Sequence, residues 1–316
     1  MNIKNYSFVF LLLSSVLLCG CKTDNISEER KTHEKSVSSS DISPFKIKTD
    51  QLLTGKVFSG FEIIKSANKN TNDWAQEIRH KFTGIEMVYV PSGIFEMGAL
   101  HDDKNIEAHY ISHTVTITKP FYIGKYEITQ GQWETVMGNN PSVFGKCVKD
   151  FPVENVSWED CQDFLEKLNQ NQDDCKFRLP YEAEWEFSAK GSINAEKFPY
   201  SGSENLNEVA WYVSNSMKST HPIGEKKTNA LNICDMSGNV WEWCQDRYGH
   251  YSAEPETDPE GAGLFSSLWY NYGRVVRGGC WASNSKSCTV VHRYHYDSAT
   301  RLNIIGFRVC IDITAE

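Results

Sequence analysis

The placement of the apolar residues is the feature that most limits what this chain can fold into. Its one long apolar run, Phe8 to Leu18, lies within the first twenty of 316 residues, and every later apolar stretch is short and interrupted. That run is too short to cross a bilayer as a stop-transfer helix. The remaining apolar side chains must therefore be buried inside a folded domain, and we expect the mature protein not to span a membrane.

The amino-terminal segment resembles a bacterial lipoprotein signal. Lys4 gives it a positive start, the apolar run follows, and Leu18-Cys19-Gly20-Cys21 closes it like a lipobox. The resemblance implies that residues 1–20 are a signal peptide and that Cys21 becomes the lipidated first residue; an ordinary secretory signal is the alternative. Several acyl chains hold a protein durably on a membrane. We expect an exported protein, anchored by lipid to the bacterial outer membrane and displayed at the cell surface.

Composition sets the expected domain boundaries. Residues 21–43 are mainly Lys, Glu, Asp, Ser and Thr, which predicts a disordered tether. Residues 44–84 contain short apolar pieces, and their pattern leaves open whether this extension packs on the domain that follows. From residue 85 to residue 316 the chain is expected to form one domain.

Charge and cysteine content exclude some functions. The formal net charge is −9 and the pI about 5.5, so the chain lacks the basic surface that displaces counterions from phosphates. We therefore expect no nucleic-acid partner. Ten cysteines in 316 residues are far sparser than in small domains that disulfides hold together, so folding is expected to rest on apolar burial. Disulfides remain possible in an exported protein, but spacing does not assign pairs.

Three helices and several short strands are predicted. Thr129 followed by Gln132 has capping-box spacing, and YEAEWEFSAK forms another helix, with Pro180 in its first turn and Gly191 just beyond its end. Ser157 begins a helix with one apolar face, formed by Cys161, Phe164, Leu165 and Leu168. MVYVPSGIFEMG and VTITKPFYIGKYEIT predict short strands. Residues 192–273 are rich in Gly, Asn, Ser and Pro and predict little regular structure, so the fold class is α+β with much irregular backbone.

Eight motifs occur in the order of their counterparts in the formylglycine-generating enzyme family, the sulfatase-modifying factors. They are MVYVPSGIFEMG, FYIGKYEITQGQWETVMG, FPVENVSWEDCQDFLEKLN, RLPYEAEWEFSAKG, HPIG, NALNICDMSGNVWEWCQD, VVRGGCW and IGFRV. Roughly residues 85 to 312 resemble that family, which implies a C-type lectin-like fold of the formylglycine-generating enzyme type. The fold alone does not settle function, because one fold hosts many activities.

The resemblance also allows the copper-binding positions of the family's oxidases to be compared with this chain. The family's oxidases hold copper between two cysteines, and alignment on the Arg-Gly-Gly motif places Cys288 at the second position but Ser283 at the first. A hydroxyl is a hard, weak donor that cannot replace a thiolate on Cu(I). Cys280 lies three residues earlier and would need local rearrangement. No nucleophile elbow or phosphate loop occurs. His292 and His295 form a close pair, but related iron oxygenases carry their ligands in a separate amino-terminal helical bundle, so we expect both to be surface side chains. We expect no copper and no enzyme, with a formylglycine-generating oxidase acting on a sulfatase cysteine as the alternative.

A structural calcium site is implied by the motif DMSGNVWEW. The family binds Ca²⁺ in the corresponding loop, and the resemblance carries the ligands over to the side chains of Asp235 and Glu242 and the carbonyls of Gly238 and Val240. Hard oxygen donors from one tight loop suit Ca²⁺. The alternative is that the acids cap turns while the neighbouring tryptophans fill the core.

The carboxy-terminal segment has an unusual composition. Lys, Glu, Gln, Met and Trp are the residue types that an Asn codon cannot reach when its adenines are replaced. These five types make up 71 of 316 residues, yet Arg277 to Cys310 contains only Trp281 and Lys286. If the region is diversified, Lys286 must belong to its fixed frame. The alternative is an ordinary loop-rich terminus that has this composition by chance.

This pattern resembles the variable proteins of diversity-generating retroelements, including treponemal variable lipoproteins. Their mutagenesis changes Asn codons within a fixed frame, which here would be RVVRGGCW, Cys288, Arg293, Arg301 and IGFRV, with the arginines bracing the loop. The implied function is non-catalytic binding of a protein or glycan on another cell or surface; a structural envelope lipoprotein is a further alternative. The implied ligand-binding positions are Ala282, Ser283, Asn284, Ser285, Ser287, Thr289, Val291, His292, Tyr294, His295, Tyr296, Asp297, Ser298, Thr300, Leu302 and Asn303.

Overall fold

The computed structural model describes residues 53–98, 111–145, 148–170, 172–192, 196–262 and 273–313. The expected signal peptide, the lipidation site Cys21 and the tether lie outside the described residues. Within the described part of the chain, no helix combines the length and the apolar character needed to cross a membrane.

A six-stranded sheet forms one part of the domain, with the order β1-β2-β3-β6-β13-β7 and antiparallel pairing throughout. Its last-but-one strand comes from the end of the chain, so the carboxy terminus closes the sheet. The bounds are β1 Phe61–Lys65, β2 Glu77–His80, β3 Glu86–Val90, β6 Phe121–Gly124, β7 Phe177–Arg178 and β13 Cys310–Asp312.

The amino-terminal extension is part of this sheet, so the expected domain start at residue 85 is too late. Strand β2 pairs with β3 over Glu77–Arg79, and the Phe61 and Ile78 side chains are buried in the main core. The Tyr122 hydroxyl also donates to the carbonyl of Ala75 at 2.5 Å. The short apolar pieces before residue 85 are thus explained, because they cover one edge of the core.

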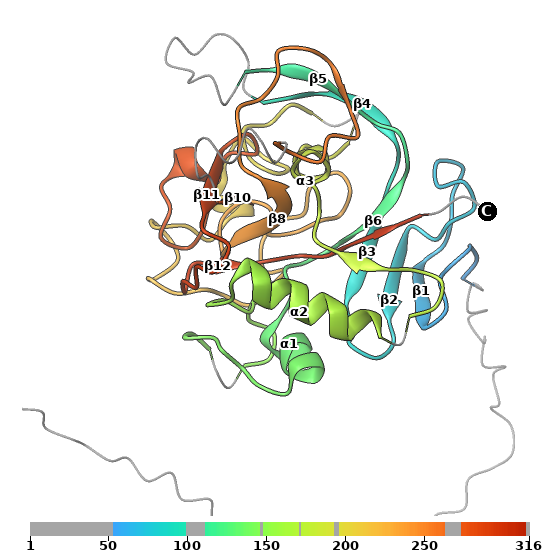
Figure 1. The fold of residues 1–316 in the computed structure, drawn as a ribbon, viewed down its shortest axis with the longest axis horizontal. Helices are drawn as coiled ribbons and strands as arrows, with labels where there is room; N and C mark the ends of the chain where they lie inside the picture. Colours follow the sequence, from blue (N-terminus) through green and yellow to red (C-terminus); the bar gives the residue numbers. More distant parts are fainter. Residues whose placement is uncertain are drawn as a thin grey trace, which may run out of the picture. The chain divides into compact units, whose positions relative to one another are not determined.

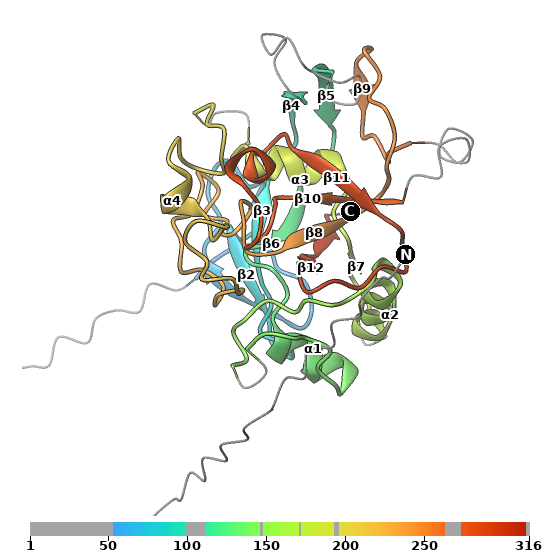
Figure 2. The same ribbon diagram turned by 90° about the vertical axis from the view of Figure 1, so that its left-hand side faces the viewer.

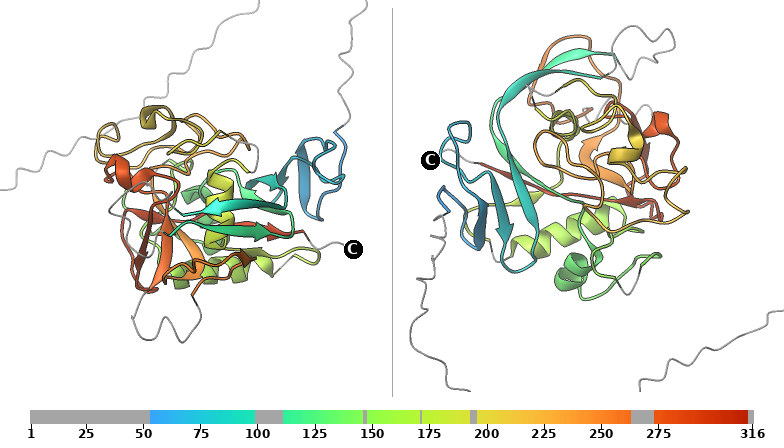
Figure 3. Two further views of the ribbon diagram at one scale, coloured as in Figure 1. Left: turned by 90° about the horizontal axis from the view of Figure 1, so that it is seen from above. Right: turned by 180° about the vertical axis from the view of Figure 1, so that it is seen from behind.

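Two smaller sheets complete the strands. One has the order β11-β10-β8-β12 and the other the order β4-β5-β9. The bounds are β4 Gly93–Met97, β5 His113–Ile117, β8 Trp241–Arg247, β9 Glu256–Thr257, β10 Arg274–Arg277, β11 Arg293–Tyr296 and β12 Ile305–Gly306. Figures 1 and 3 show the four-stranded sheet of β11, β10, β8 and β12 on the side of the domain opposite to β1 and β2.

Strand β8 is the exception to the expectation of little regular structure between residues 192 and 273. It is seven residues long and lies between β10 and β12. Its first four residues are all buried, so it lacks the alternation of apolar and polar residues that marks a half-exposed strand. For this reason the sequence pattern did not predict it.

The predicted helices are present. The bounds are α1 Gln130–Met137, α2 Trp158–Asn169, α3 Glu182–Ala189 and α4 Leu206–Val209, with the 3-10 helix η2 at Ser285–Cys288. Thr129 and Ser157 both form capping boxes, and the predicted apolar face of α2 is buried. Tyr181 is the N-cap of α3, so Pro180 precedes this helix rather than occupying its first turn. All eight residues of α3 are buried, and the helix contacts β4, β8 and β10 (Figure 2).

The α+β fold class is therefore confirmed. Long irregular segments connect the sheets, and α3 lies among strands of two of them. The segment between β10 and β12 contains all sixteen predicted binding positions, and Arg293 within it contacts Glu182 at the amino-terminal end of α3.

The core depends on aromatic packing at α2. The Phe164 ring is fully buried and stacks on Trp133 at 5.4 Å, with Phe307 edge-on at 5.4 Å. We predict that Phe164→Ala lowers the free energy of unfolding by about 3–5 kcal/mol, because truncation leaves a cavity between these rings. Denaturant unfolding measures the change. Glu166→Ala on the exposed side of the same helix is the control and should change stability by less than about 0.5 kcal/mol.

Candidate functional site

A glycine turn begins the carboxy-terminal loop directly after β10. Gly278 and Gly279 have φ angles of +93° and +78°, which side-chain-bearing residues rarely adopt. A Cβ on Gly279 would lie 2.7 Å from the carbonyl oxygen of Ser287 and 2.8 Å from the sulfur of Cys288. The turn therefore requires glycine, and it brings the start of the loop against η2.

Backbone hydrogen bonds to distant segments hold the loop. They are Trp281 N to Asn239 O at 2.7 Å, Val213 N to Ser283 O at 3.0 Å, Val290 N to Pro199 O at 2.9 Å, Trp158 N to Ser298 O at 2.9 Å and Asn155 N to Leu302 O at 3.0 Å. Because these bonds use amides and carbonyls, they do not depend on which side chains occupy the loop.

Two buried arginines anchor the strands on either side of the loop. Arg277 donates to Glu186 at 2.5 Å and to the carbonyls of Val290 and Val291. Arg293 donates to both oxygens of Glu182, at 2.8 and 2.5 Å. Both glutamates lie on α3, so this helix fixes β10 and β11 through charge-assisted hydrogen bonds.

The carboxylate of Glu186 is held in its charged form. Burial alone would raise the pKa of Glu186, but the ammonium of Lys190 and the guanidinium of Arg277 outweigh this effect and bring the pKa below its usual value. The amide of Gly98 also donates to Glu186 at 2.8 Å. This buried anion is therefore satisfied from three directions.

The expected bracing by the remaining arginines is confirmed. Arg301 donates to both oxygens of Asp160 at 2.6 and 2.7 Å, which ties the exposed part of the loop to α2. Arg308 is fully buried and donates to both oxygens of Glu242 and to the carbonyl of Gly124.

The structure places most of the predicted binding positions at or near the surface. Six of the sixteen are exposed: Ala282, Asn284, Ser285, Tyr294, Asp297 and Leu302. Nine are half-buried: Ser287, Thr289, Val291, His292, His295, Tyr296, Ser298, Thr300 and Asn303.

Ser283 is the position that the structure corrects. Its side chain is buried, and its hydroxyl accepts a hydrogen bond from the amide of Cys280 at 2.9 Å. Ser283 therefore supports the turn after Gly279 and is not available to contact a ligand.

Aromatic side chains form a row along β11. Alternation along the strand puts Arg293 and His295 on one face and Tyr294 and Tyr296 on the other. The Tyr294 ring is 47% exposed and lies 5.1 Å from the Tyr296 ring, which contacts Trp243 at 6.4 Å. This row offers contact area on rigid side chains at one edge of the four-stranded sheet.

Fixed apolar side chains border this surface, and sequence reasoning missed them. Val143, Val213 and Met217 are exposed. Val213 donates to the carbonyl of Ser283 through its amide, and Phe144, next to Val143, contacts the Trp281 ring at 5.3 Å. The signal was absent because these residues lie in other segments of the chain and only the fold brings them to the loop.

The copper position is more sulfur-rich than expected. The sulfur of Cys280 lies 3.3 Å from the hydroxyl oxygen of Ser283, so a thiol lies beside the residue that aligns with the first copper cysteine. Burial raises the pKa of the Cys280 thiol and raises that of Cys288 to about 12. Both are therefore thiols at neutral pH, whereas a copper ligand is a thiolate.

The described cysteines are buried and free. They are Cys161, Cys175, Cys234, Cys244, Cys280, Cys288 and Cys310. Cys147 lies outside the described residues.

The predicted calcium loop contains an excess of buried carboxylates. Asp235 accepts from the amide of Gly224 through Oδ2, while its buried Oδ1 has no hydrogen-bond partner. Glu242 differs, because Trp185 and Arg308 already donate to its oxygens at 2.6–2.7 Å. Burial raises the pKa of Asp235 to about 6, and it also raises that of the adjacent Glu127.

These groups fit a cation in part. No three His, Cys, Asp or Glu side chains in the described ranges are arranged to hold a metal ion, so a cation at Asp235 needs backbone carbonyls as further ligands. The carbonyls of Gly238 and Val240 are the ones implied by the family pattern. Calcium binding stays a prediction.

The buried ion pairs generate a test. We predict that Glu186→Gln lowers the free energy of unfolding by about 3–5 kcal/mol, because it removes the carboxylate that pairs with the buried Arg277 at 2.5 Å and leaves only the longer contact with Glu182 at 3.4 Å. The folded-state pKa of Glu186 lies below the usual value of about 4.3. Its stabilisation is therefore complete above that pH and is lost as the pH falls through the folded-state pKa, and the variant should lack this part of the acid transition. Glu204→Gln, at an exposed position, is the control.

The comparisons with known proteins agree with this architecture. A model of the sulfatase-modifying factor enzyme 1-like domain matches residues 74–313. The chain is 33% identical to the chaperone protein LppX of Paenibacillus barcinonensis, over 67% of this chain and 84% of that protein. It is 27% identical to the formylglycine-generating enzyme of Streptomyces coelicolor, over 57% of this chain and 58% of the enzyme, so less than two thirds of the enzyme is matched.

A solved structure agrees as well. Treponema denticola variable protein 1 is similar with a TM-score of 0.62 and 30% identity, covering 72% of this chain and 95% of that chain. Residues 74–313, which the family model matches, include α3, both arginine-bearing strands and the carboxy-terminal loop. The chain therefore belongs to the sulfatase-modifying factor enzyme 1-like family and has its C-type lectin-like fold.

Proposed function

We propose that this protein is a non-catalytic, surface-displayed lipoprotein that binds a ligand through a diversified carboxy-terminal face. One observation carries the proposal: distant backbone groups and buried arginines hold the loop, while side chains such as those of Tyr294 and Leu302 point to solvent. A surface built in this way can change its side chains without losing its fold. The similarity to a protein named as variable supports the same reading of the loop.

The ligand class follows from the chemistry of the face. Tyr, Ser, Asn and His at exposed positions provide rigid contact area and adaptable hydrogen bonds, as in antibody paratopes. The exposed Val143, Val213 and Met217 add apolar area at the border. We propose a protein or a glycan on another surface as the partner, and the net charge of −9 argues against nucleic acid.

Anchoring at the outer membrane belongs to the proposal. It rests on the lipobox-like Leu18-Cys19-Gly20-Cys21 and on the tether predicted after it. Lipid on Cys21 would hold the domain at the cell surface without a spanning helix.

The alternative function is a formylglycine-generating oxidase, and one observation favours keeping it. Cys288 aligns with the second copper cysteine of the family, and the sulfur of Cys280 is 3.3 Å from the hydroxyl of Ser283, which aligns with the first. Against it, both thiols are buried and protonated at neutral pH, so Cu(I) would have to displace two protons in an apolar site. Copper-dependent oxidation of a sulfatase cysteine peptide would establish this alternative.

We further propose that the Asp235 loop binds Ca²⁺ as a structural ion. The unpartnered Oδ1 of Asp235 and the nearby Glu127 and Glu242 leave this region with more negative charge than Arg308 alone balances. A cation bound there would supply the missing partner. It would also stabilise the loop in which the Gly238 amide donates to the carbonyl of Gly278 and the Asn239 carbonyl accepts from the amide of Trp281.

Diversification is tested by sequencing the carboxy-terminal codons and the downstream DNA across many cells of one clonal line. We predict substitutions in the codons of exposed residues such as Asn284 and Tyr294, at nucleotides that correspond to adenines in a nearby template copy of the segment. Gly279 and Arg293 should stay constant because their roles allow no other residue, and Ser283 should accept only small side chains because it is buried. An invariant segment without a template would contradict the proposal and favour a structural envelope lipoprotein.

Calcium binding is tested by thermal unfolding with Ca²⁺ or with a chelator. A ligand that binds only the folded state at one hundred times its Kd stabilises by about 2.7 kcal/mol, so we predict a higher Tm with Ca²⁺. Asp235→Asn should abolish the increase, whereas Asp297→Asn, at an exposed position, should retain it. An unchanged Tm with millimolar Ca²⁺ would show that the loop binds no calcium.

A further inference from the structure

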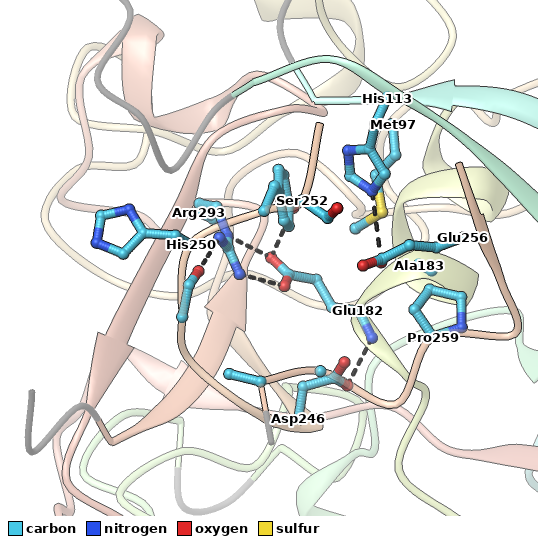
Figure 4. A pocket seen from close by; sticks show the side chains of 14 residues that line it. Met97, His113, Glu182, Ala183, Asp246, His250, Ser252, Glu256, Pro259 and Arg293 are labelled. Atoms are coloured by element: carbon cyan, nitrogen blue, oxygen red, sulfur yellow. Dashed lines mark hydrogen bonds and ion pairs between the residues drawn. The ribbon is translucent and has the colours of Figure 1, made fainter. Parts of the chain in front are cut away.

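A pocket of about 350 Å³ lies at the amino-terminal end of α3, away from the exposed side of the carboxy-terminal loop. Strands β4, β5, β8, β9 and β11 and the segment after β8 all contribute to its lining (Figure 4). Its size is within the range of small-molecule sites. No function proposed above uses it.

The positive charge of the pocket is already engaged. Arg293 donates to both oxygens of Glu182 and, at 2.6 Å, to the carbonyl of Gly249. The Tyr251 hydroxyl donates to Glu182 at 3.1 Å, and its ring lies under the guanidinium of Arg293 at 3.9 Å. Neither Arg293 nor Glu182 is therefore set up to bind a charged ligand directly.

The remaining polar groups of the pocket are mainly acceptors. His113 Nδ1 donates to the carbonyl of Ile111 at 3.2 Å, so in this tautomer the lone pair of the imidazole lies on Nε2. That atom is buried and has no hydrogen-bond partner; it points towards Glu256, whose Oε2 is 3.7 Å away (Figure 4). Two acceptors thus face each other across a gap that a donor on a ligand can fill.

A third carboxyl adds to the imbalance. Asp246 accepts from the amide of Glu182 at 2.7 Å and is almost fully buried. Burial, followed by the charge of Glu182, raises the pKa of Asp246 well above its usual value. A nearby cation would relieve this cost, because it favours the charged carboxylate.

We propose that this pocket binds a small molecule through a primary ammonium group that bridges His113 and Glu256. A nitrogen about 2.9 Å from each acceptor fits beside the 3.7 Å gap on the pocket side. An ammonium has three donors and no acceptor, which complements His113 Nε2 and Glu256. An anionic ligand would meet these carboxyls unpaired, and within the described ranges the acidic and imidazole groups form no three-membered metal cluster.

The test is calorimetric titration of the mature protein with cadaverine, and with pentane-1,5-diol as an uncharged probe of the same length. We expect cadaverine to bind and the diol not to bind. Glu256→Gln should weaken cadaverine at least about tenfold, because it removes a charged hydrogen-bond acceptor. The control Glu254→Gln, at an exposed position two residues earlier, should leave the affinity unchanged.

Imidazole ¹⁵N spectra locate the binding. Cadaverine should shift the His113 Nε2 resonance in the wild-type protein, and the same shift in Glu256→Gln should need at least about ten times more cadaverine. Nα-acetyl-lysine amide, titrated in parallel, distinguishes a free amine from a lysine side chain as the source of the ammonium group. Equal binding of the diol, an unshifted His113 resonance, or saturation by Zn²⁺ with no response to cadaverine would each overturn the proposal.

Discussion

The interaction on which the functional part of the molecule depends is the buried pairing of α3 with two arginines. Glu186 with Arg277 and Glu182 with Arg293 join one helix to β10 and β11. Burying four charges costs several kcal/mol per ion, and only close pairing with further hydrogen bonds offsets that cost. Both conditions are met here, because the arginines also donate to loop carbonyls and the glutamates also accept from an amide and a hydroxyl.

This pairing separates the roles of the two faces of β11. Arg293 points inward to Glu182, while Tyr294, the next residue, is exposed. Because side chains alternate along a strand, one face can be kept constant for stability while the other changes. The glycine turn extends the same separation into the loop, since Gly279 packs against the backbone of Ser287 and leaves neighbouring side chains such as Asn284 outside.

Local sequence patterns predicted the elements whose signal is local. Helix α2 shows this best, because its capping box and its apolar face at Phe164 both follow from spacing within twelve residues. Strand β8 was not predicted, because its first four residues are all buried and show no alternation of apolar and polar side chains. The pairing of β1 with β2 was not predicted either, because both strands are short and are stabilised by core residues from distant parts of the chain. In the site, the bracing arginines were foreseen, but the burial of Ser283 depends on contacts that only the folded loop creates.

The hydrogen bond between Ser283 and Cys280 explains how the loop after β10 keeps its turn. Ser283 stands at the first copper position of the family and uses its hydroxyl to accept from the Cys280 amide, a bond that stabilises the turn. A sulfur remains within 3.3 Å, yet it is buried as a thiol and packs with the core. The turn is thus held by a hydrogen bond within the loop, while neighbouring side chains such as that of Asn284 are exposed.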